Sequence, residues 1–256
     1  MRPKRALFRA AAAISRVVNA GLRPLGFRLS RRTPPLRTTS DMVRALFQDK
    51  TEAYVIDVGA AAGNFSAEVI QAVPRAKIVC VEPVPECHKT LTARFAKSDV
   101  SLVQAALGDH DGEVIFHETS GRDSSSVLPM ERHREEFPLV SWEVATYPVK
   151  LLRLDTLLAG DPETLAIDLL KIDAQGYELP VLVGAERTLR RCRFVLVETA
   201  FMPLYLGQAP FEDVVVFLHQ RGFRVSDYVE VIRSNRTSDL LQMDFLYQRN
   251  QDIAGS

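Results

Sequence analysis

One acidic side chain and a run of small residues stand out as groups that could bind a ligand. Asp57 interrupts the apolar stretch Val55 to Val58, and the small residues Gly59 to Gly63 follow it directly. Such a turn between a strand and a helix lets a ligand lie close to the backbone. Glu82 ends a second apolar stretch, 19 residues after Gly63. A carboxylate at that distance typically accepts hydrogen bonds from ribose hydroxyl groups, so the spacing predicts a cofactor that contains adenosine.

The loop also indicates which adenosine cofactor to expect. Gly59, Ala61 and Gly63 give Gly-x-Ala-x-Gly, which fits poorly to the Gly-x-Gly-x-x-Gly turn that binds dinucleotides. A carboxylate at Asp57 disfavours a pyrophosphate and favours a ligand with an ammonium and a sulfonium group. We therefore expect S-adenosyl-L-methionine, with Asp57 supporting the loop and facing the cationic end. Two alternatives stay open: an NAD-dependent oxidoreductase, and a non-catalytic carbohydrate-binding or scaffold protein on the same fold.

A second group of charged residues is expected near the same edge of the sheet. Asp173 ends the stretch LLKID, and Glu198 ends FVLVE. A carboxylate at a strand tip can orient a hydroxyl group and accept its proton, so both are candidate catalytic bases. Glu178 is expected to open a helix, where a carboxylate complements the helix dipole. Lys171 is expected to form a structural ion pair with Asp168 or Glu198.

Strand and helix patterns alternate along most of the chain. Strand-like stretches are expected at 53–59, 77–83, 100–107, 112–119, 146–154, 165–173, 193–199, 223–228 and 243–247. Helices are expected from a cap at Ser40 or Asp41 to about Asp49, and at 64–73, 84–96, 179–191 and 212–221. The pattern predicts an α/β fold with a mostly parallel sheet and helices on both faces. A long polar loop between the fourth and fifth strands interrupts it. Ligands of such sheets bind at the carboxyl ends of the strands, where the strand order reverses.

Composition limits the partners and the location. The 32 basic and 32 acidic residues balance, which argues against a nucleic-acid partner. Ten of the basic residues and none of the acidic ones lie in residues 1–40, so we expect a basic helical extension there and a catalytic domain at 41–250. The extension could dock on the domain or form a flexible segment, lie on an anionic membrane surface, or act as a transit peptide.

The remaining composition indicates a cytoplasmic protein. No stretch reaches the ~18 apolar residues of a transmembrane helix. The three cysteines and five histidines show no metal-ligand spacing, which favours a reduced compartment and predicts no metal site. Asp173 and Glu198 could still share a divalent cation, and the sequence does not decide this. Peripheral membrane contact through residues 1–40 stays an alternative to docking. The sequence does not indicate the oligomeric state.

A resemblance to a known family becomes specific once several motifs are taken together. VIDVGAAAGNFS, CVEPVPECHKTL, AALGD, SSSVL, LLRLDTLL, LLKIDAQGYELPVLVGA and VLVETAFMPLY occur in this order. The set resembles the FkbM family of S-adenosylmethionine-dependent O-methyltransferases over about Tyr54 to Tyr247. The resemblance implies a class I, Rossmann-like methyltransferase fold. It also implies a small-molecule or glycan acceptor whose hydroxyl group belongs to a sugar, a glycolipid, a polyketide or a related metabolite.

The resemblance also assigns cofactor contacts. Asp57 and the loop residues Gly59, Ala60 and Gly63 match its cofactor loop, and Glu82 matches its ribose position. Gly108 and Asp109 fall where such folds meet the adenine ring, although GDHDG could equally be a simple turn. One departure is Ala61, where the family usually has Asn.

Overall fold

The computed structural model describes residues 38–250. The expected basic extension therefore lies outside the described residues, apart from its last three positions. Within residues 38–250, no helix is both long and apolar enough to cross a membrane.

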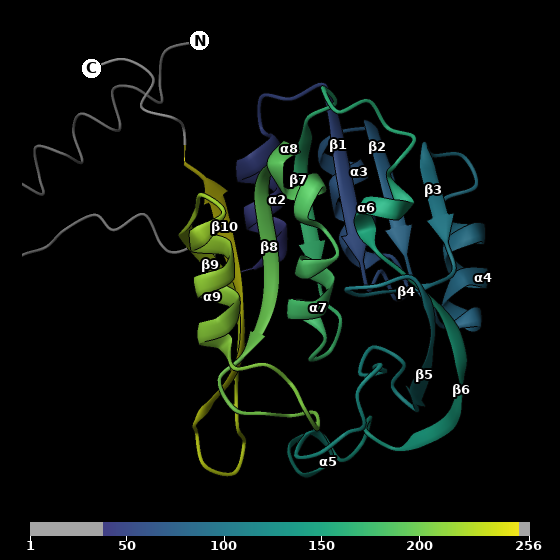
Figure 1. The fold of residues 1–256 in the computed structure, drawn as a ribbon, viewed down its shortest axis with the longest axis vertical. Helices are drawn as coiled ribbons and strands as arrows, with labels where there is room; N and C mark the ends of the chain where they lie inside the picture. The colour runs from purple at the N-terminus through teal and green to yellow at the C-terminus, as the bar shows by residue number, and fades with distance from the viewer. Residues whose placement is uncertain (1–37, 251–256) are drawn as a thin grey trace, which may run out of the picture. The chain divides into compact units, whose positions relative to one another are not determined.

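A seven-stranded sheet forms the centre of the described domain (Figure 1). Its order is β3 (Val100–Val103), β2 (Arg75–Val81), β1 (Glu52–Val58), β7 (Ile167–Ile172), β8 (Cys192–Ala200), β10 (Leu240–Arg249) and β9 (Phe223–Arg233). The first five strands are parallel, and β10 is antiparallel to both of its neighbours. The mostly parallel α/β sheet predicted from the sequence is confirmed.

Helices cover both faces of this sheet, as the sequence predicted (Figure 1). One face packs against α2 (Thr39–Phe47), α3 (Asn64–Ala72) and α4 (Pro85–Arg94). The other packs against α6 (Leu154–Leu157), α7 (Glu178–Val183), α8 (Glu186–Arg191) and α9 (Phe211–Gln220). Neighbouring residues of the central strands, such as Val55 and Ile56 or Leu169 and Leu170, are fully buried on opposite faces. This two-sided burial explains why these strands are continuously apolar.

The strand order reverses beside β1. The chain runs from β1 outward to β2 and β3, and later returns to place β7 on the other side of β1. The carboxyl ends of β1 and β7 approach so closely that a Cβ atom on Gly59 would lie 1.8 Å from the carbonyl oxygen of Asp173. Gly59 also has a φ of +71°, which L-residues rarely adopt. Glycine is therefore required where the first strand enters the loop.

The third predicted strand, 100–107, is divided between two sheets, which corrects that prediction. Val100–Val103 forms β3 at the edge of the main sheet, while β4 (Ala106–Leu107) joins β6 (Glu143–Leu152) and β5 (Gly112–Thr119) in a three-stranded sheet. The pairing of β3 with β2 ends at Val103, whose carbonyl oxygen accepts from the N–H of Glu82, the residue after β2. Beyond this point the chain leaves the main sheet. Strands β5 and β6 are antiparallel, as expected. We call residues 120–142 between them the insert; it contains α5 (His133–Glu136).

Two helix boundaries also differ from prediction. The helix expected at 179–191 consists of α7 and α8, because Gly184 turns the chain where a Cβ atom would meet the carbonyl oxygen of Gly108 at 1.9 Å. Asp155 then accepts hydrogen bonds from backbone N–H groups of α8. Helix α2 is capped by Thr38, whose hydroxyl oxygen accepts from the N–H of Asp41, and not by Ser40 or Asp41.

Candidate functional site

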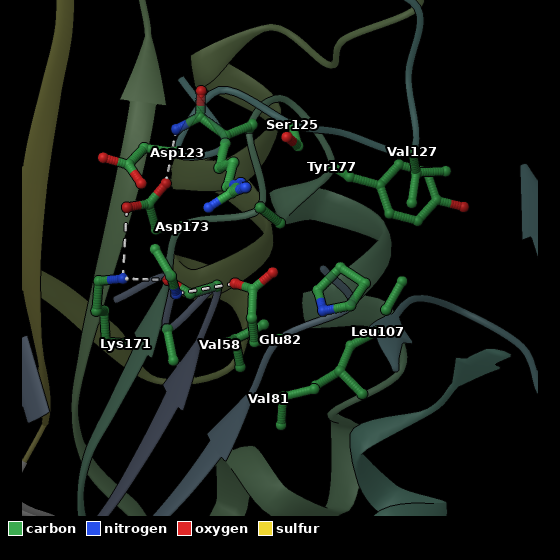
Figure 2. Close-up of a pocket in the computed structure, with 18 of the residues that line it drawn as sticks. Val58, Val81, Glu82, Leu107, Asp123, Ser125, Val127, Lys171, Asp173 and Tyr177 are labelled. Carbon is green, nitrogen blue, oxygen red and sulfur yellow. Dashed lines mark hydrogen bonds and ion pairs between the residues drawn. The ribbon is translucent and has the colours of Figure 1, made fainter. Parts of the chain in front are cut away.

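A cavity of about 250 Å³ opens at the carboxyl ends of β1, β2 and β7, where the strand order reverses. Figure 2 shows the side chains that line it. The loop after β1 and the residues after β2 and β7 form its floor, and residues of β4, β5 and the insert form the opposite wall. The cavity therefore lies where ligands bind in open α/β sheets.

The loop after β1 contributes shape more than hydrogen-bond donors. The N–H groups of Gly59 and Ala60 both donate to the carbonyl oxygen of Val81, at 3.0 and 3.2 Å. Gly59, Ala60 and Ala61 line the cavity. Gly63 does not; it has a φ of +78° and begins α3, where a Cβ atom would collide with Phe95. Gly63 thus shapes the loop from behind.

Glu82 lines the cavity just beyond the end of β2 and is 5% exposed. Its two carboxylate oxygens accept from the N–H groups of Ala61 and Val84, each at 2.8 Å. Burial raises the pKa of Glu82 to about 7, although these two hydrogen bonds and the charge of Lys171 oppose the shift. Each oxygen keeps a lone pair for a second donor. Glu82 is therefore placed to accept hydroxyl groups of a ligand.

Asp57 supports the loop from below and does not line the cavity. It is fully buried, accepts a hydrogen bond from the Ser66 hydroxyl group at 2.6 Å, and has the Lys171 ammonium group 3.3 Å away. The supporting role expected for Asp57 is seen in the structure. Its burial excludes the expected direct contact with a cationic ligand.

Lys171 joins Asp57 to the cavity. Its ammonium group lies 3.4 Å from Asp173 and donates to the carbonyl oxygen of Gly59 at 3.1 Å. The expected partners were wrong, because Asp168 pairs with Lys50 and Glu198 pairs with Gln175. One cation between two carboxylates gives the triplet of Lys171, Asp57 and Asp173 a formal charge of −1, which suits a cationic ligand.

An apolar wall faces Glu82 across the cavity. Figure 2 shows Glu82 between this wall, which includes Leu107 and Tyr177, and the pair formed by Lys171 and Asp173. Its members are Pro83, Leu107, Phe116, Val127 and Tyr177. A flat apolar ring fits such a wall. Sequence reasoning missed it, because its members come from five separate segments.

Gly108 and Asp109 do not line the cavity, contrary to the adenine role expected for them. The N–H of Gly108 donates to the carbonyl oxygen of Leu152, and the exposed carboxylate of Asp109 lies 2.7 Å from His110. Gly108 is buried and Asp109 is exposed, which is compatible with the alternative prediction of a simple turn. Leu107, the last residue of β4, reaches the cavity in their place.

The two candidate bases occupy different positions. Asp173 lines the cavity, whereas Glu198 lies outside the cavity wall and accepts from the amide of Gln175 at 2.9 Å. Glu198 is opposite Asp244 on the neighbouring strand β10. Burial, and then the charge of Asp173, raise the pKa of Glu198 well above its usual value and that of Asp244 to about 8. Burial therefore favours the neutral form of both carboxyl groups.

The insert supplies a carboxylate that sequence reasoning also missed. Asp123 lines the cavity and lies beside Asp173 in Figure 2. Burial and the charge of Asp173 raise its pKa. Its neighbour Ser125 lines the cavity too, but the Ser125 hydroxyl oxygen accepts from the N–H of Thr119. Two carboxylates from different parts of the chain thus face one end of the cavity, and several hydroxyl groups of one ligand could donate to them.

The described residues were also compared with the arrangements that bind metal ions. Within residues 38–250, no group of three or more His, Cys, Asp or Glu side chains is arranged to hold a metal ion.

Comparison with known proteins places this architecture in a family. Residues 57–225 match the methyltransferase FkbM domain family. The chain is 27% identical over 178 residues to the 2-O-methyltransferase NoeI of Sinorhizobium fredii, covering 66% of this chain and 72% of that protein. It is 24% identical over 209 residues to the hexuronic acid methyltransferase AglP of Haloferax volcanii, covering 80% and 77%.

A solved structure with a similar course of the chain is the 1,6-didemethyltoxoflavin-N1-methyltransferase of Burkholderia thailandensis, with bound 1,6-didemethyltoxoflavin and S-adenosylhomocysteine. The TM-score is 0.46 at 12% identity, over 95% of this chain and 90% of that one.

Glu178 yields a prediction about stability. It is 5% exposed, and one of its oxygens accepts from the N–H groups of Ala174 and Gly176, each at 3.0 Å. Burial raises its pKa to about 7, so the stability that its neutral form contributes is complete below pH ~4.5 and is lost as the pH rises through 7. Glu178→Gln keeps the acceptor oxygen without the charge. We expect its free energy of unfolding to exceed that of the wild type by about 1–3 kcal/mol at pH 8 and to match it at pH 5.

Urea denaturation at both pH values measures this difference. Glu178→Ala, which removes the acceptor, serves as the control and should be destabilised at both. A Gln variant that is less stable than the wild type at pH 8 would contradict the burial argument.

Proposed function

The chain belongs to the FkbM family of methyltransferases, and on this premise we propose that it transfers a methyl group from S-adenosylmethionine to a hydroxyl group of a sugar or a similar polyhydroxylated acceptor. The observation that carries the proposal is the placement of Glu82 and Asp173 on one cavity at the reversal of the strand order. The names of the relatives, a 2-O-methyltransferase and a hexuronic acid methyltransferase, support a sugar acceptor. The NAD-dependent and non-catalytic alternatives lose their support, because the family is one of methyltransferases.

The residues present fit S-adenosylmethionine. The apolar wall with Leu107 and Tyr177 would hold the adenine ring, and Glu82 would accept from the ribose hydroxyl groups. The negative triplet around Lys171 complements a cationic ligand. When bound, the cofactor supplies an electrophilic methyl group on a sulfonium whose sulfur keeps the bonding electron pair as the methyl leaves.

Asp173 would receive the proton of the acceptor. The proton of the acceptor hydroxyl group would pass to the Asp173 carboxylate as the acceptor oxygen takes up the methyl group that the cofactor would supply. Lys171 and Gln175 contact Asp173 and hold the carboxylate in place. Alignment of the reacting atoms supplies most of the rate, and proton transfer contributes on the order of 10²-fold. Asp123 would bind a second hydroxyl group of the same acceptor.

Glu198 suits the role of base less well. It lies outside the cavity wall, and burial raises its pKa well above the usual value, which disfavours the ionised form that a base needs. The assignment of Asp173 as the base separates two residues that the sequence treated as equal candidates.

The pKa of Glu82 predicts how cofactor affinity depends on pH. Ribose hydroxyl groups donate to the ionised carboxylate, whose pKa is about 7 in the free protein. The dissociation constant of S-adenosylhomocysteine should therefore rise by up to about tenfold between pH 8 and pH 6. Glu82→Gln should bind more weakly at pH 8, by roughly 1–3 kcal/mol, and lose this pH dependence. Calorimetry at the two pH values decides, and an unchanged pH dependence in the variant would remove Glu82 from the ribose role.

Activity should separate Asp173 from Glu198. The assay follows a labelled methyl group from S-adenosylmethionine onto a panel of neutral sugars, hexuronic acids and their glycosides. Asp173→Asn should lose on the order of 10²-fold in kcat. Glu198→Gln should retain most of its turnover, because residue 198 lies outside the cavity wall and the amide oxygen still accepts from Gln175.

Two outcomes count against this account. Near-normal turnover in Asp173→Asn together with an inactive Glu198→Gln moves the base to Glu198. A wild-type protein that binds cofactor but methylates no hydroxylated acceptor contradicts the proposed acceptor class.

A further inference from the structure

Gln175 contacts both candidate bases, Asp173 and Glu198, and was not expected to take part in the site. It is 9% exposed and lines the cavity two residues after Asp173. Its φ of +51° is unusual for a residue with a side chain, and the adjacent Gly176 has a φ of +93°. A residue other than glycine keeps such a backbone conformation only where the surrounding structure determines it strongly.

The Gln175 amide group has a partner on each atom. Its nitrogen donates to Asp173 at 2.8 Å and to Glu198 at 2.9 Å, which uses both of its N–H bonds. Its oxygen accepts from the Tyr205 hydroxyl group at 2.7 Å. The shorter tyrosine hydrogen bond favours the orientation in which the amide nitrogen faces the two carboxyl groups. A reversed amide would place its oxygen against the Asp173 carboxylate.

Tyr205 is itself held firmly. It is 1% exposed, and its hydroxyl group also lies 3.0 Å from the carbonyl oxygen of Ser124 in the insert. A Cβ atom on Gly176 would lie only 3.0 Å from the Tyr205 ring, so the absence of a side chain at Gly176 lets the ring pack this closely. His133 also packs against the Tyr205 ring, with ring centroids 5.3 Å apart. Its pKa falls to about 4 through burial, which keeps it neutral.

The insert is tied to the same residue a second time. The Ser126 hydroxyl group donates to the backbone carbonyl oxygen of Gln175 at 2.7 Å, and it accepts from the N–H of Leu128. Asp123 and Ser125, which line the cavity, alternate along the chain with Ser124 and Ser126. The wall that faces the acceptor and the carboxylate proposed to act on it are therefore joined through Gln175.

We propose that Gln175 is a positioning residue, which holds the Asp173 carboxylate toward the acceptor and couples its orientation to the insert through Tyr205. The inference rests on the proposed methyl transfer and deepens it, by adding a residue that neither touches the methyl group nor takes a proton. Two groups restrict the rotation of the Asp173 carboxylate. The Gln175 amide donates to one oxygen, and the Lys171 ammonium group lies 3.4 Å from the other. A carboxylate held in this way spends less time in unproductive orientations.

The charge around Asp173 makes this donor important. The titratable groups near it come from six elements: Lys171 of β7, Asp57 of β1, Glu198 of β8, Asp244 of β10, Glu178 of α7 and Asp123 of the insert. Only Lys171 among these is a cation. A neutral amide supplies two further donors without adding charge, and donors favour the ionised form of a carboxyl group.

The test is a double-mutant cycle in the full chain. Gln175→Met keeps the length of the side chain and removes all its hydrogen bonds, whereas Tyr205→Phe removes only the hydroxyl group that orients the amide. We expect Gln175→Met to lower kcat by about tenfold or more with the affinity for S-adenosylhomocysteine nearly unchanged, and to move the ascending limb of the pH–rate profile to higher pH. Tyr205→Phe should show a smaller change in the same direction. The double variant should resemble Gln175→Met, because both act through one amide.

Gln242→Met is the matched control. Gln242 is a buried glutamine of β10, 5% exposed, and among the hydrogen bonds of residues 38–250 its amide contacts neither Asp173 nor Glu198. Its loss should leave the pH profile in place. Additive effects of Gln175→Met and Tyr205→Phe, or turnover within twofold of the wild type in Gln175→Met, would overturn the proposal.

Crystal structures of the wild type and of Tyr205→Phe provide a readout that does not depend on turnover. We expect the Asp173 carboxylate to rotate, or to adopt more than one conformer, once the amide loses its orienting partner. An unchanged single conformer of Asp173 and of the Gln175 amide overturns the positioning role, even if no acceptor is found. A wild type without turnover counts against the proposed function alone.

Discussion

A buried lysine in the middle of a parallel sheet determines much of the arrangement around the cavity. Lys171 is 9% exposed, on a strand whose other residues are mostly apolar. A buried ammonium group is tolerated only with opposite charges and acceptors close by, and removing one partner from such a group typically costs ~3–5 kcal/mol. Asp57, Asp173 and the carbonyl oxygen of Gly59 supply these partners from both sides. The requirement of Lys171 for partners therefore joins the end of β1 to the end of β7, the point where the cavity opens.

The insert forms part of the cavity wall opposite the loops that follow β1, β2 and β7. Its polar residues could have remained in solvent, yet Ser124 and Ser126 contact Tyr205 and Gln175, and His133 packs against Tyr205 in a small apolar cluster. Burial lowers the pKa of His133 to about 4, so it acts as a neutral packing residue and not as an acid or base near neutral pH. An acceptor would therefore meet a wall held by uncharged contacts, with Asp123 as the carboxylate that the insert contributes.

The sequence predicted the parts of this site that depend on local patterns. The carboxyl ends of parallel strands lie at the same end of a sheet. The loop after Asp57 and the positions of Glu82 and Asp173 could therefore be inferred from where the apolar stretches end. The split of 100–107 could not, because it depends on where β2 ends and on the pairing of β4 with β6. The partners of Lys171 were wrong for a similar reason: Asp168, three residues earlier, meets Lys50 from a distant part of the chain. Gln175 and Tyr205 are 30 residues apart, and nothing in either local pattern indicates that they touch.

A crystal structure of the full chain with S-adenosylhomocysteine tests the central claim most directly, because the ligand reports its own orientation along the cavity. We predict that both ribose hydroxyl groups lie within hydrogen-bonding distance of the Glu82 carboxylate and that the adenine ring contacts Leu107 and Tyr177. The sulfur atom should lie at the end of the cavity that Asp173 and Asp123 share. A ribose bound away from Glu82, or a sulfur atom directed away from Asp173, would contradict the account of how this cavity transfers a methyl group.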